Sequence, residues 1–411
     1  METVGGHEIG EPPCSPRERR LQAKDGVLVF LPRFGAGGAS KVSCVLASRL
    51  QQSGVRTTVA TLGPGGGRAR RFLDEDVPVL PLTPIKGSAR GAAHLLAALV
   101  PLALSIRRLR PGVLLSAGNH ANILCAAAHW LSARDDTNLV LKMTNPIRRT
   151  GRGRLRSGLK AVAYRLAIGR ASAVLVLSPE DAAEIVAFHP AAANKVQVVS
   201  NPYLDSLPAS RSPAERTAEP AMLLAVGRLT EQKNFELLLR AAAQLGDRPW
   251  RLKVLGQGAR LASLQALAKT LGIADRVEFV GYVSDPRPYY REAQALAITS
   301  AWEGLPAVAV EALAEGCPVV AVDCSPALSR LITASGAGRL SPASPEAYAA
   351  ALAQALDEDR PSVEAAALAP FTLESAIRSH INSLMLANAS RLVEARRGRG
   401  LRAGGWRFGQ P

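Results

Sequence analysis

Two carboxylates, Glu303 and Glu311, are separated by seven residues in the stretch 295–322, which reads as strand, loop, helix and strand. Pro306 opens the alanine-rich helical segment, and Gly316 ends it before the next apolar run. The two acids therefore flank a helix start, where free N–H groups and the positive end of the helix dipole favour an anion. An anion between two hydroxyl-bearing moieties fits this layout, and a nucleoside diphosphate sugar is such a molecule.

Two cations occupy a second loop of the same kind. The segment 226–234 reads VGRLTEQKN and carries Arg228 and Lys233 between a predicted strand and a predicted helix. Open α/β folds bind ligands at the carboxyl ends of their strands, where this segment falls. A guanidinium and an ammonium group at that edge match a diphosphate. Glycine turns at Gly256 and Gly281 follow the next two predicted strands, so they fall at the same edge.

Another glycine-rich turn, 35–38, follows the first predicted strand of the chain and leads into a helix. Backbone N–H groups in such a turn can approach a phosphate or a carbohydrate. A dinucleotide fingerprint would place a third glycine where Ser40 stands and an acid at the end of the second strand, where 61–63 reads TLG. NAD binding is therefore disfavoured, and a tight turn without a ligand stays open as the alternative.

The elements that position these residues follow one pattern, in which apolar runs of strand length alternate with helical segments. This alternation predicts parallel sheets with helices on both faces. A stretch rich in proline, serine and charge interrupts the pattern before it starts again, so we expect two Rossmann-like domains. The predicted organisation is a flexible lead-in 1–24, a first domain 25–200, a linker 201–220, a second domain 221–370, a helix 371–396 that returns to the first domain, and a disordered basic tail 397–411.

Length and composition agree with two globular domains. The chain has 411 residues and is 47% hydrophobic, which is enough to fill two cores. Its net charge of +16 favours anionic partners without choosing among phosphates, lipids and nucleic acids. The five cysteines are scattered and odd in number, and the first 20 residues contain no apolar core of a secretory signal. We therefore expect a cytoplasmic protein in a reducing compartment.

Metal and cofactor requirements are not expected. The acids at 74–76 resemble a DxD metal motif, but they precede a short strand of the first domain and lack the fold that surrounds such a motif, so we interpret them as solvated. No His, Cys and Asp cluster in the sequence has the spacing of metal ligands.

The second half of the chain resembles the retaining glycosyltransferases of family 4. Four segments carry the resemblance, in the order of that family: GRLTEQKN at 227–234, the GQG turn at 256–258, EGLPAVAVE at 303–311 and EGCPVVAVD at 315–323. The resemblance extends over about 26–392 and is most specific in the second domain. It implies the GT-B arrangement, in which two Rossmann-like α/β domains face a cleft and a C-terminal helix crosses back to the first domain. The first domain would bind the acceptor and the second the nucleotide sugar.

The resemblance also implies roles for residues of the second domain. Arg228 and Lys233 would hold the donor diphosphate, and Glu311 would bind the ribose hydroxyls. Glu303 would lie by the transferred sugar, and the backbone of 304–305, Gly304 and Leu305, would face the phosphates.

Further roles fall on glycines and on a histidine. Gly256 of the GQG turn would contact the donor, while Gly37 and Gly38 would lie under the donor near the acceptor. His120 stands where the family often places a histidine near the sugar ring, although a structural histidine in a first helical turn fits the sequence equally well. The family often has a Gly-Gly turn after PVVAVD, whereas this chain has Cys324, Ser325 and Pro326, which puts the phosphate contacts of that loop in question.

The stretch 147–170 contains eight basic residues and no acid, and Tyr164 is its only aromatic residue. Nucleic-acid binding is disfavoured because few rings are present to stack bases. An anionic membrane surface that presents a lipid-linked acceptor fits better, and a solvated basic face stays open. The apolar stretch 94–106 is too short to span a bilayer and is followed by three arginines. A surface helix of an α/β domain with one buried face is favoured, and a helix that lies at a bilayer surface stays open as the alternative.

We therefore expect a retaining glycosyltransferase that moves a sugar from a nucleoside diphosphate sugar to a hydroxyl acceptor, with attack from the same face assisted by the leaving phosphate. The acceptor would be a lipid-linked or envelope glycan, met by a cytoplasmic protein at the inner face of the cell membrane. Two alternatives remain. A nucleotide-sugar epimerase on the same fold would need acid and base carboxylates on both walls of the cleft, and a non-catalytic protein would bind anionic ligands through its cations alone.

Overall fold

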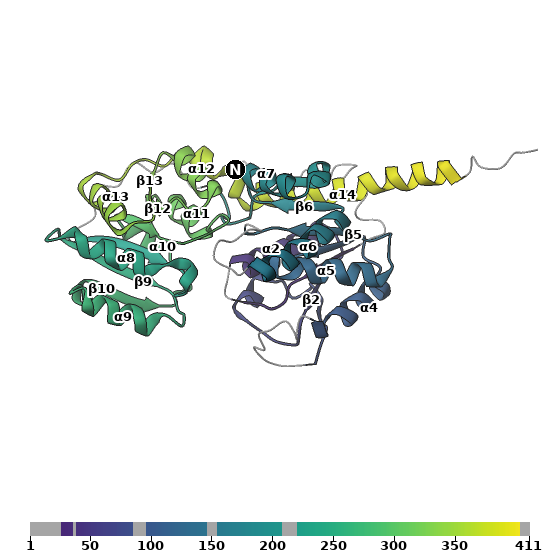
Figure 1. The fold of residues 1–411 in the computed structure, drawn as a ribbon, viewed down its shortest axis with the longest axis horizontal. Coiled ribbons are helices and arrows are strands. Elements are labelled where there is room, and N and C mark those ends of the chain that lie inside the picture. Colours follow the sequence, from purple (N-terminus) through teal and green to yellow (C-terminus); the bar gives the residue numbers. More distant parts are fainter. Residues whose placement is uncertain (1–25, 36–37, 85–95, 146–153, 208–219, 403–411) are drawn as a thin grey trace, which may run out of the picture.

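Two α/β units lie side by side and are joined at one end (Figure 1). The computed structural model describes residues 26–35, 38–84, 96–145, 154–207 and 220–402. The predicted lead-in 1–24 therefore lies outside the described residues. None of the helices in these ranges is long and apolar enough to span a membrane.

The first unit is a seven-stranded parallel sheet with the strand order β3-β2-β1-β4-β5-β6-β7. The five inner strands are short and almost entirely buried, as expected of a parallel sheet covered by helices, whereas the edge strands β3 and β7 are partly exposed. They are β1 (Val27–Phe30), β2 (Thr57–Thr61), β3 (Val79–Pro81), β4 (Val113–Ser116), β5 (Asn138–Lys142), β6 (Ala173–Val176) and β7 (Val196–Val198).

Helices cover both faces of this sheet and supply two separate apolar cores. One face carries α4, α5, α6 and α7, and the other carries α2 and the C-terminal helix. The bounds are α2 (Gly38–Gln52), η1 (Arg68–Phe72), α4 (Leu99–Leu109), α5 (Asn119–Ser132), α6 (Arg154–Arg170), α7 (Pro179–Phe188) and η2 (Pro190–Lys195). The apolar stretch 94–106, which the sequence predicts to be a surface helix, lies largely in α4, which begins at Leu99; residues 85–95 lie outside the described residues.

The second unit repeats the plan with six parallel strands in the order β10-β9-β8-β11-β12-β13. This is the order of a doubly wound nucleotide-binding sheet, so the two predicted Rossmann-like domains are confirmed. The strands are β8 (Ala221–Val226), β9 (Trp250–Leu255), β10 (Val277–Gly281), β11 (Ala295–Ile298), β12 (Val319–Val322) and β13 (Gly338–Ser341).

Helices again cover both faces of the second sheet. One face carries α8, α9 and α13, and the other carries α10, α11 and α12. Their bounds are η3 (Glu231–Lys233), α8 (Phe235–Ala242), η4 (Ala243–Leu245), α9 (Leu261–Thr270), η5 (Ala274–Arg276), α10 (Arg287–Glu292), α11 (Ala307–Ala314), α12 (Pro326–Ser335), α13 (Pro345–Asp357) and η6 (Ala365–Phe371).

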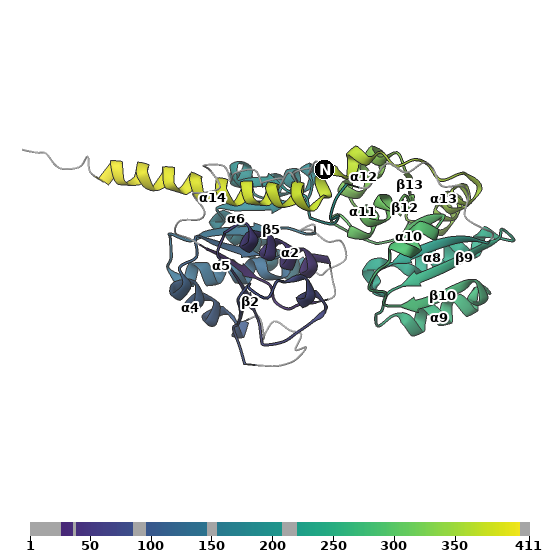
Figure 2. The same ribbon diagram turned by 180° about the vertical axis from the view of Figure 1, so that it is seen from behind.

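The last helix, α14 (Leu373–Arg402), leaves the second unit and runs along the first (Figure 2). Ile377 and Leu384 join the core on the α2 side of the first sheet. His380 on the same helix faces the buried Lys142 of β5, with 2.9 Å between His380 Nε2 and Lys142 Nζ. The predicted return of this helix to the first domain is thus confirmed.

The predicted disordered tail 397–411 needs a correction at its start. The structure continues α14 to Arg402, so the first six residues of that stretch are helical. Residues 397–402 contain no proline to break the helix, which continues through Gly398 and Gly400 and ends before the adjacent glycines Gly404 and Gly405. Residues 403–411 lie outside the described part.

Both connections between the units pass through one place. Leu204, in the described part of the predicted linker 201–220, forms a parallel bridge with Thr372. The Leu373 N–H donates to the Leu204 carbonyl at 2.6 Å, and the rings of Tyr203 and Phe371 stack with 6.2 Å between their centroids. The two chain crossings therefore form one small paired structure. Residues 208–219 of the linker are outside the described residues.

Candidate functional site

Two loops at neighbouring strands form the centre of the site. The first follows β8 and contains Arg228 and Lys233, and the second joins β11 to α11 and contains Glu303. Because β8 and β11 are adjacent and parallel, their carboxyl ends lie at the same edge of the sheet. Backbone groups join the two loops, since the Ala301 N–H donates to the Gln232 carbonyl at 2.8 Å.

Lys233 and Glu303 form an ion pair across these loops. Lys233 Nζ donates to Glu303 Oε1 at 2.7 Å, and the two side chains are only 15% and 11% exposed. The Lys233 carbonyl also accepts a hydrogen bond from the Thr299 hydroxyl at 3.1 Å. The predicted cation and the predicted sugar-side acid are therefore direct partners, which the sequence alone did not indicate.

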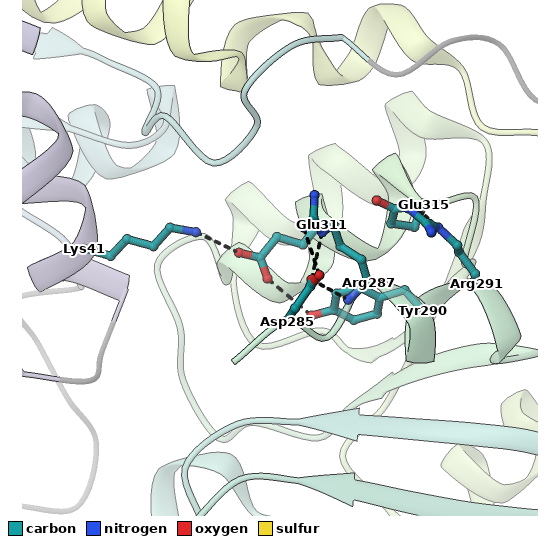
Figure 3. A network of polar contacts seen from close by, with 7 residues as sticks. All are labelled: Lys41, Asp285, Arg287, Tyr290, Arg291, Glu311 and Glu315. Carbon is teal, nitrogen blue, oxygen red and sulfur yellow. Dashed lines mark hydrogen bonds and ion pairs between the residues drawn. The ribbon is translucent and has the colours of Figure 1, made fainter. Parts of the chain in front are cut away.

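Glu311 lies in the second turn of α11 and has partners from two elements (Figure 3). The Tyr290 hydroxyl donates to Glu311 Oε2 at 3.3 Å. Burial, with a further contribution from the Glu311 charge, raises the pKa of Tyr290 well above its ordinary value, so this hydroxyl keeps its proton. Lys41 of α2, in the first domain, lies 3.7 Å from Glu311 Oε1.

The remaining predicted cation, Arg228, lies in the loop after β8, and its side chain is exposed. The GQG turn supports the loop that carries it. Gly256 has a φ of +150°, and a Cβ there would lie 1.7 Å from the Gly227 carbonyl oxygen. Gly256 is thus required by backbone packing against Gly227, and its predicted contact with a donor remains a prediction.

Gly304 lies where the two units approach most closely along this loop. A Cβ on Gly304 would lie 2.4 Å from the carbonyl oxygen of Thr144, which follows β5 in the first unit. The Gly304 carbonyl accepts a hydrogen bond from Ser325, the N-cap of α12, and the Leu305 carbonyl accepts one from Tyr203 at 3.1 Å. Ser325 is therefore engaged in holding the loop of Glu303.

The predicted site residues of the first unit fall at or near the starts of α2 and α5. Gly38 begins α2, and a Cβ there would meet no atom within 4 Å. Gly37 lies outside the described residues. His120 lies in the first turn of α5, but the position of its side chain is not among the described ones. Asn119, its neighbour, accepts hydrogen bonds from the Thr144 and Asn145 N–H groups at 2.7 and 3.1 Å.

A second contact between the units lies at the ends of β9 and β10. The Arg68 guanidinium stacks 3.7 Å from the centre of the Tyr282 ring and donates to Gln257 Oε1 at 3.2 Å. Sequence reasoning missed Arg68, Lys41 and Tyr290. For Lys41 a signal was present, because it stands in the first turn of the helix after the predicted glycine turn. Ser300, two residues after the end of β11, has a buried hydroxyl with no hydrogen-bond partner in the described part of the chain.

Comparison with protein families divides the chain where the structure does. Residues 208–367 match the model of the "Glycosyl transferases group 1", and residues 37–202 match the "Glycosyl transferase 4-like domain". Together the two matches contain every predicted site residue and all strands of both sheets except β1, which precedes residue 37. Two domain models that both describe glycosyl transferases are therefore matched, in the order expected from the sequence.

A curated relative matches part of the chain. The amylovoran biosynthesis glycosyltransferase AmsD of Erwinia amylovora is 32% identical over 114 residues, which is 28% of this chain and 32% of that protein. The stretches that match the first curated relatives span about a third of the length of those proteins or less.

Solved structures match nearly the whole fold. The lipopolysaccharide outer core galactosyltransferase WaaB has a TM-score of 0.67 at 19% identity, over 88% of this chain and 99% of that one. Anabaena HepE, solved in complex with UDP and glucose, has a TM-score of 0.66 at 19% identity, over 91% of this chain and 100% of that one. At these identities the comparison establishes the shared GT-B fold.

Proposed function

This chain belongs to the group 1 glycosyltransferases, and we propose that it transfers a sugar from a nucleoside diphosphate sugar to a hydroxyl acceptor. The observation that carries the proposal is the Lys233–Glu303 pair beside the start of α11, with Glu311 one turn further along the helix. Cations, a helix N-terminus and two acids then converge on the edge of the sheet where a donor would lie.

The chemical step depends on the departing diphosphate. Breaking the bond between the sugar and the phosphate places negative charge on the leaving group. Hydrogen-bond donors and cations that are already positioned next to this charge lower the barrier. Arg228, Lys233 and the free N–H groups at the start of α11 would supply these donors. These groups lie together at one edge of the sheet, so the nucleotide sugar would not need to bring them together when it binds.

Glu303 would position the sugar rather than attack it. Its carboxylate is already engaged by Lys233, which leaves lone pairs for the sugar hydroxyls but makes it a weaker nucleophile. We therefore propose attack by the acceptor hydroxyl on the same face as the leaving group, with the departing phosphate taking the proton. The product would keep the anomeric configuration of the donor.

The choice of donor and acceptor draws on the relatives. HepE was solved with UDP and glucose, so uridine diphosphate sugars are the first donors to test. AmsD and WaaB are named for amylovoran biosynthesis and for the lipopolysaccharide outer core. We propose an envelope glycan, carried on a lipid at the membrane surface, as the acceptor class.

An exposed face of the first unit supports a membrane location. Leu96, which precedes α4, and Val100 and Leu104 of α4 recur every four residues, and their side chains are 54–66% exposed. On α6, which packs on α5 as α4 does, Leu159 and Leu166 are 78% and 70% exposed. Exposed basic residues accompany them, namely Arg107, Arg108, Arg110, Lys160 and Arg165. An apolar surface with basic neighbours suits an anionic bilayer surface.

A panel of nucleotide sugars tests the activity. The purified chain would be incubated with UDP-, GDP-, ADP- and dTDP-sugars in the presence of detergent-extracted lipid-linked glycans, and transfer followed by mass spectrometry. Glu303→Gln and Lys233→Ala should abolish most of the turnover. If no nucleotide sugar binds or reacts, the transferase proposal is wrong. Epimerisation of the donor without an acceptor would favour an epimerase, and salt-sensitive nucleic-acid binding that neither substitution alters would favour an anionic-ligand-binding protein.

Sedimentation with vesicles tests the membrane face. Binding to vesicles of phosphatidylglycerol and phosphatidylcholine should exceed binding to phosphatidylcholine alone, and Leu159→Ser with Leu166→Ser should reduce it. Leu261→Ser, which changes an exposed leucine of the second unit, is the matched control. Equal binding by all variants would exclude this face as the membrane contact.

A further inference from the structure

Lys41, a cation of the first unit, lies next to Glu311, the residue of the second unit that is predicted to bind the ribose. Lys41 stands in the first turn of α2, and its ammonium lies 3.7 Å from Glu311 Oε1 (Figure 3). The same ammonium lies 5.3 Å from the centre of the Phe72 ring, an attractive geometry for a cation over an aromatic face. Lys41 is therefore held between its own unit and Glu311.

The lone pairs of Glu311 decide what else this carboxylate can bind. An ionised carboxylate offers about four acceptor positions on its two oxygens. Tyr290 takes one on Oε2, and Lys41 approaches Oε1. Because the 3.7 Å contact of Lys41 is an ion pair longer than a hydrogen bond, at least one position on each oxygen is left, which is enough for the two hydroxyls of a ribose diol. Lys41 and the diol can therefore share the carboxylate.

We propose that Lys41 is a positioning residue for the donor, which orients the Glu311 carboxylate from the opposite unit so that its two remaining acceptor positions receive the ribose diol. This inference rests on the proposed function, because it takes Glu311 as the ribose ligand. Lys41 makes recognition of the ribose depend on the approach of the two units. A single side chain thereby links donor binding to their closure.

The second contact between the units supports this reading. Arg68 reaches Tyr282 and Gln257 at the ends of β10 and β9, while Lys41 reaches α11. Two cations from separate elements of the first unit thus meet the carboxyl edge of the second sheet. The position of Lys41 is therefore part of an extended contact rather than an isolated side-chain encounter.

A Lys41 side chain that competed with the ribose diol for Glu311 would have the opposite effect on nucleotide affinity. Its removal would then free Glu311 and tighten nucleotide binding, whereas loss of a positioning residue weakens it. The sign of the change in affinity separates the two. Because the ion pair is 40% and 23% exposed, the expected change is modest, about three- to fivefold.

The experiment measures affinity by calorimetry, with UDP and its 2′,3′-dideoxy form as probes, or with the corresponding pair of whichever nucleoside diphosphate binds in the donor panel. Lys41→Gln should raise the Kd for UDP about three- to fivefold and leave that for the dideoxy form unchanged. Lys41→Arg should keep most of the affinity. Arg49→Gln is the matched control, because it removes the same charge from α2 at a side chain that bonds to Gln52 instead.

A double-mutant cycle then tests whether Lys41 acts through Glu311. In a Glu311→Gln background, Lys41→Gln should cause no further loss of affinity. The inference is overturned if Lys41→Gln leaves UDP binding unchanged, tightens it, or weakens UDP and its dideoxy form equally. In those cases Glu311→Gln would still weaken UDP binding and the proposed function would stand. If the wild-type chain binds no nucleoside diphosphate, the proposed function falls as well.

Discussion

Lys233 donates a 2.7 Å hydrogen bond to Glu303 from a loop 70 positions earlier in the chain, and both side chains are largely buried. The pair fixes the spacing between the cation proposed for the diphosphate and the acid proposed for the sugar. It also leaves each charge dependent on the other, since an unpaired buried charge is costly.

Lys233→Met should therefore harm both folding and turnover. It removes the partner of a buried carboxylate, so we expect the free energy of unfolding in urea to fall by about 2–4 kcal/mol. It also removes a donor to the leaving group, so kcat should fall by about 10²–10³-fold. The double variant Lys233→Met with Glu303→Gln should recover most of the stability and none of the activity. Recovery of activity in the double variant would contradict the assigned role of Lys233.

Gly304→Ala should slow the reaction without unfolding either unit. Its new methyl group would lie 2.4 Å from the Thr144 carbonyl oxygen, so the units would have to move apart. A displacement of about 1 Å can cost on the order of 10²-fold in rate. Initial rates and thermal melting of this variant would be compared with those of Gly65→Ala, which meets no atom within 4 Å. Full activity of Gly304→Ala would mean that the close approach is not needed for turnover.

Gly38→Ala tests whether the glycine turn serves a ligand. A Cβ at Gly38 meets no atom within 4 Å, and alanine favours the helix it begins, so stability should be unchanged or rise by up to about 1 kcal/mol. If the donor or acceptor lies against this turn, the KM of one of them should rise several-fold nevertheless. Unchanged KM values for both substrates would favour the alternative of a turn without a ligand.

The buried Lys142 predicts a pH dependence of stability. Burial lowers the pKa of its ammonium from 10.5 to about 7. Between these values the unfolded chain binds a proton that the folded chain does not, so the stability contributed by this site rises with pH through the window and is constant below it. Lys142→Met should flatten the rise in unfolding free energy between about pH 7 and about pH 8.5. Lys269→Met, at an exposed lysine of α9, should leave the slope unchanged; a wild-type slope in Lys142→Met would refute the assignment.

The sequence predicted the second unit closely because its signals are local. A proline and a glycine bound α11, and the helix begins at Ala307, one residue after the predicted start at Pro306. Strands β8, β11 and β12 follow from uninterrupted apolar runs, which have few alternatives in a covered parallel sheet. The loops that carry Arg228 and Glu303 then fall at one edge by topology alone.

The contacts between the units could not be predicted from such local signals. Lys41 and Glu311 lie in different domains, and no local period connects them; the placement depends on the bridge at Leu204 and on where α14 docks. Arg68 stands in a stretch with two other arginines, a composition typical of solvated loops. The use of Gly256 and Gly304 for close backbone contacts also depends on neighbours that only the folded chain brings near.

The docking of α14 on the first unit has a consequence for how the chain folds during its synthesis. Ile377, Leu384 and Ala387 complete a core of the first unit, yet they are made after the whole second unit. Burying side chains of the size of Ile377 and Leu384 is worth about 1.5–3 kcal/mol each, a large part of the stability of a domain. On the ribosome, the unit that emerges first is therefore the last to be completed, and part of one of its apolar faces stays uncovered until α14 has been made.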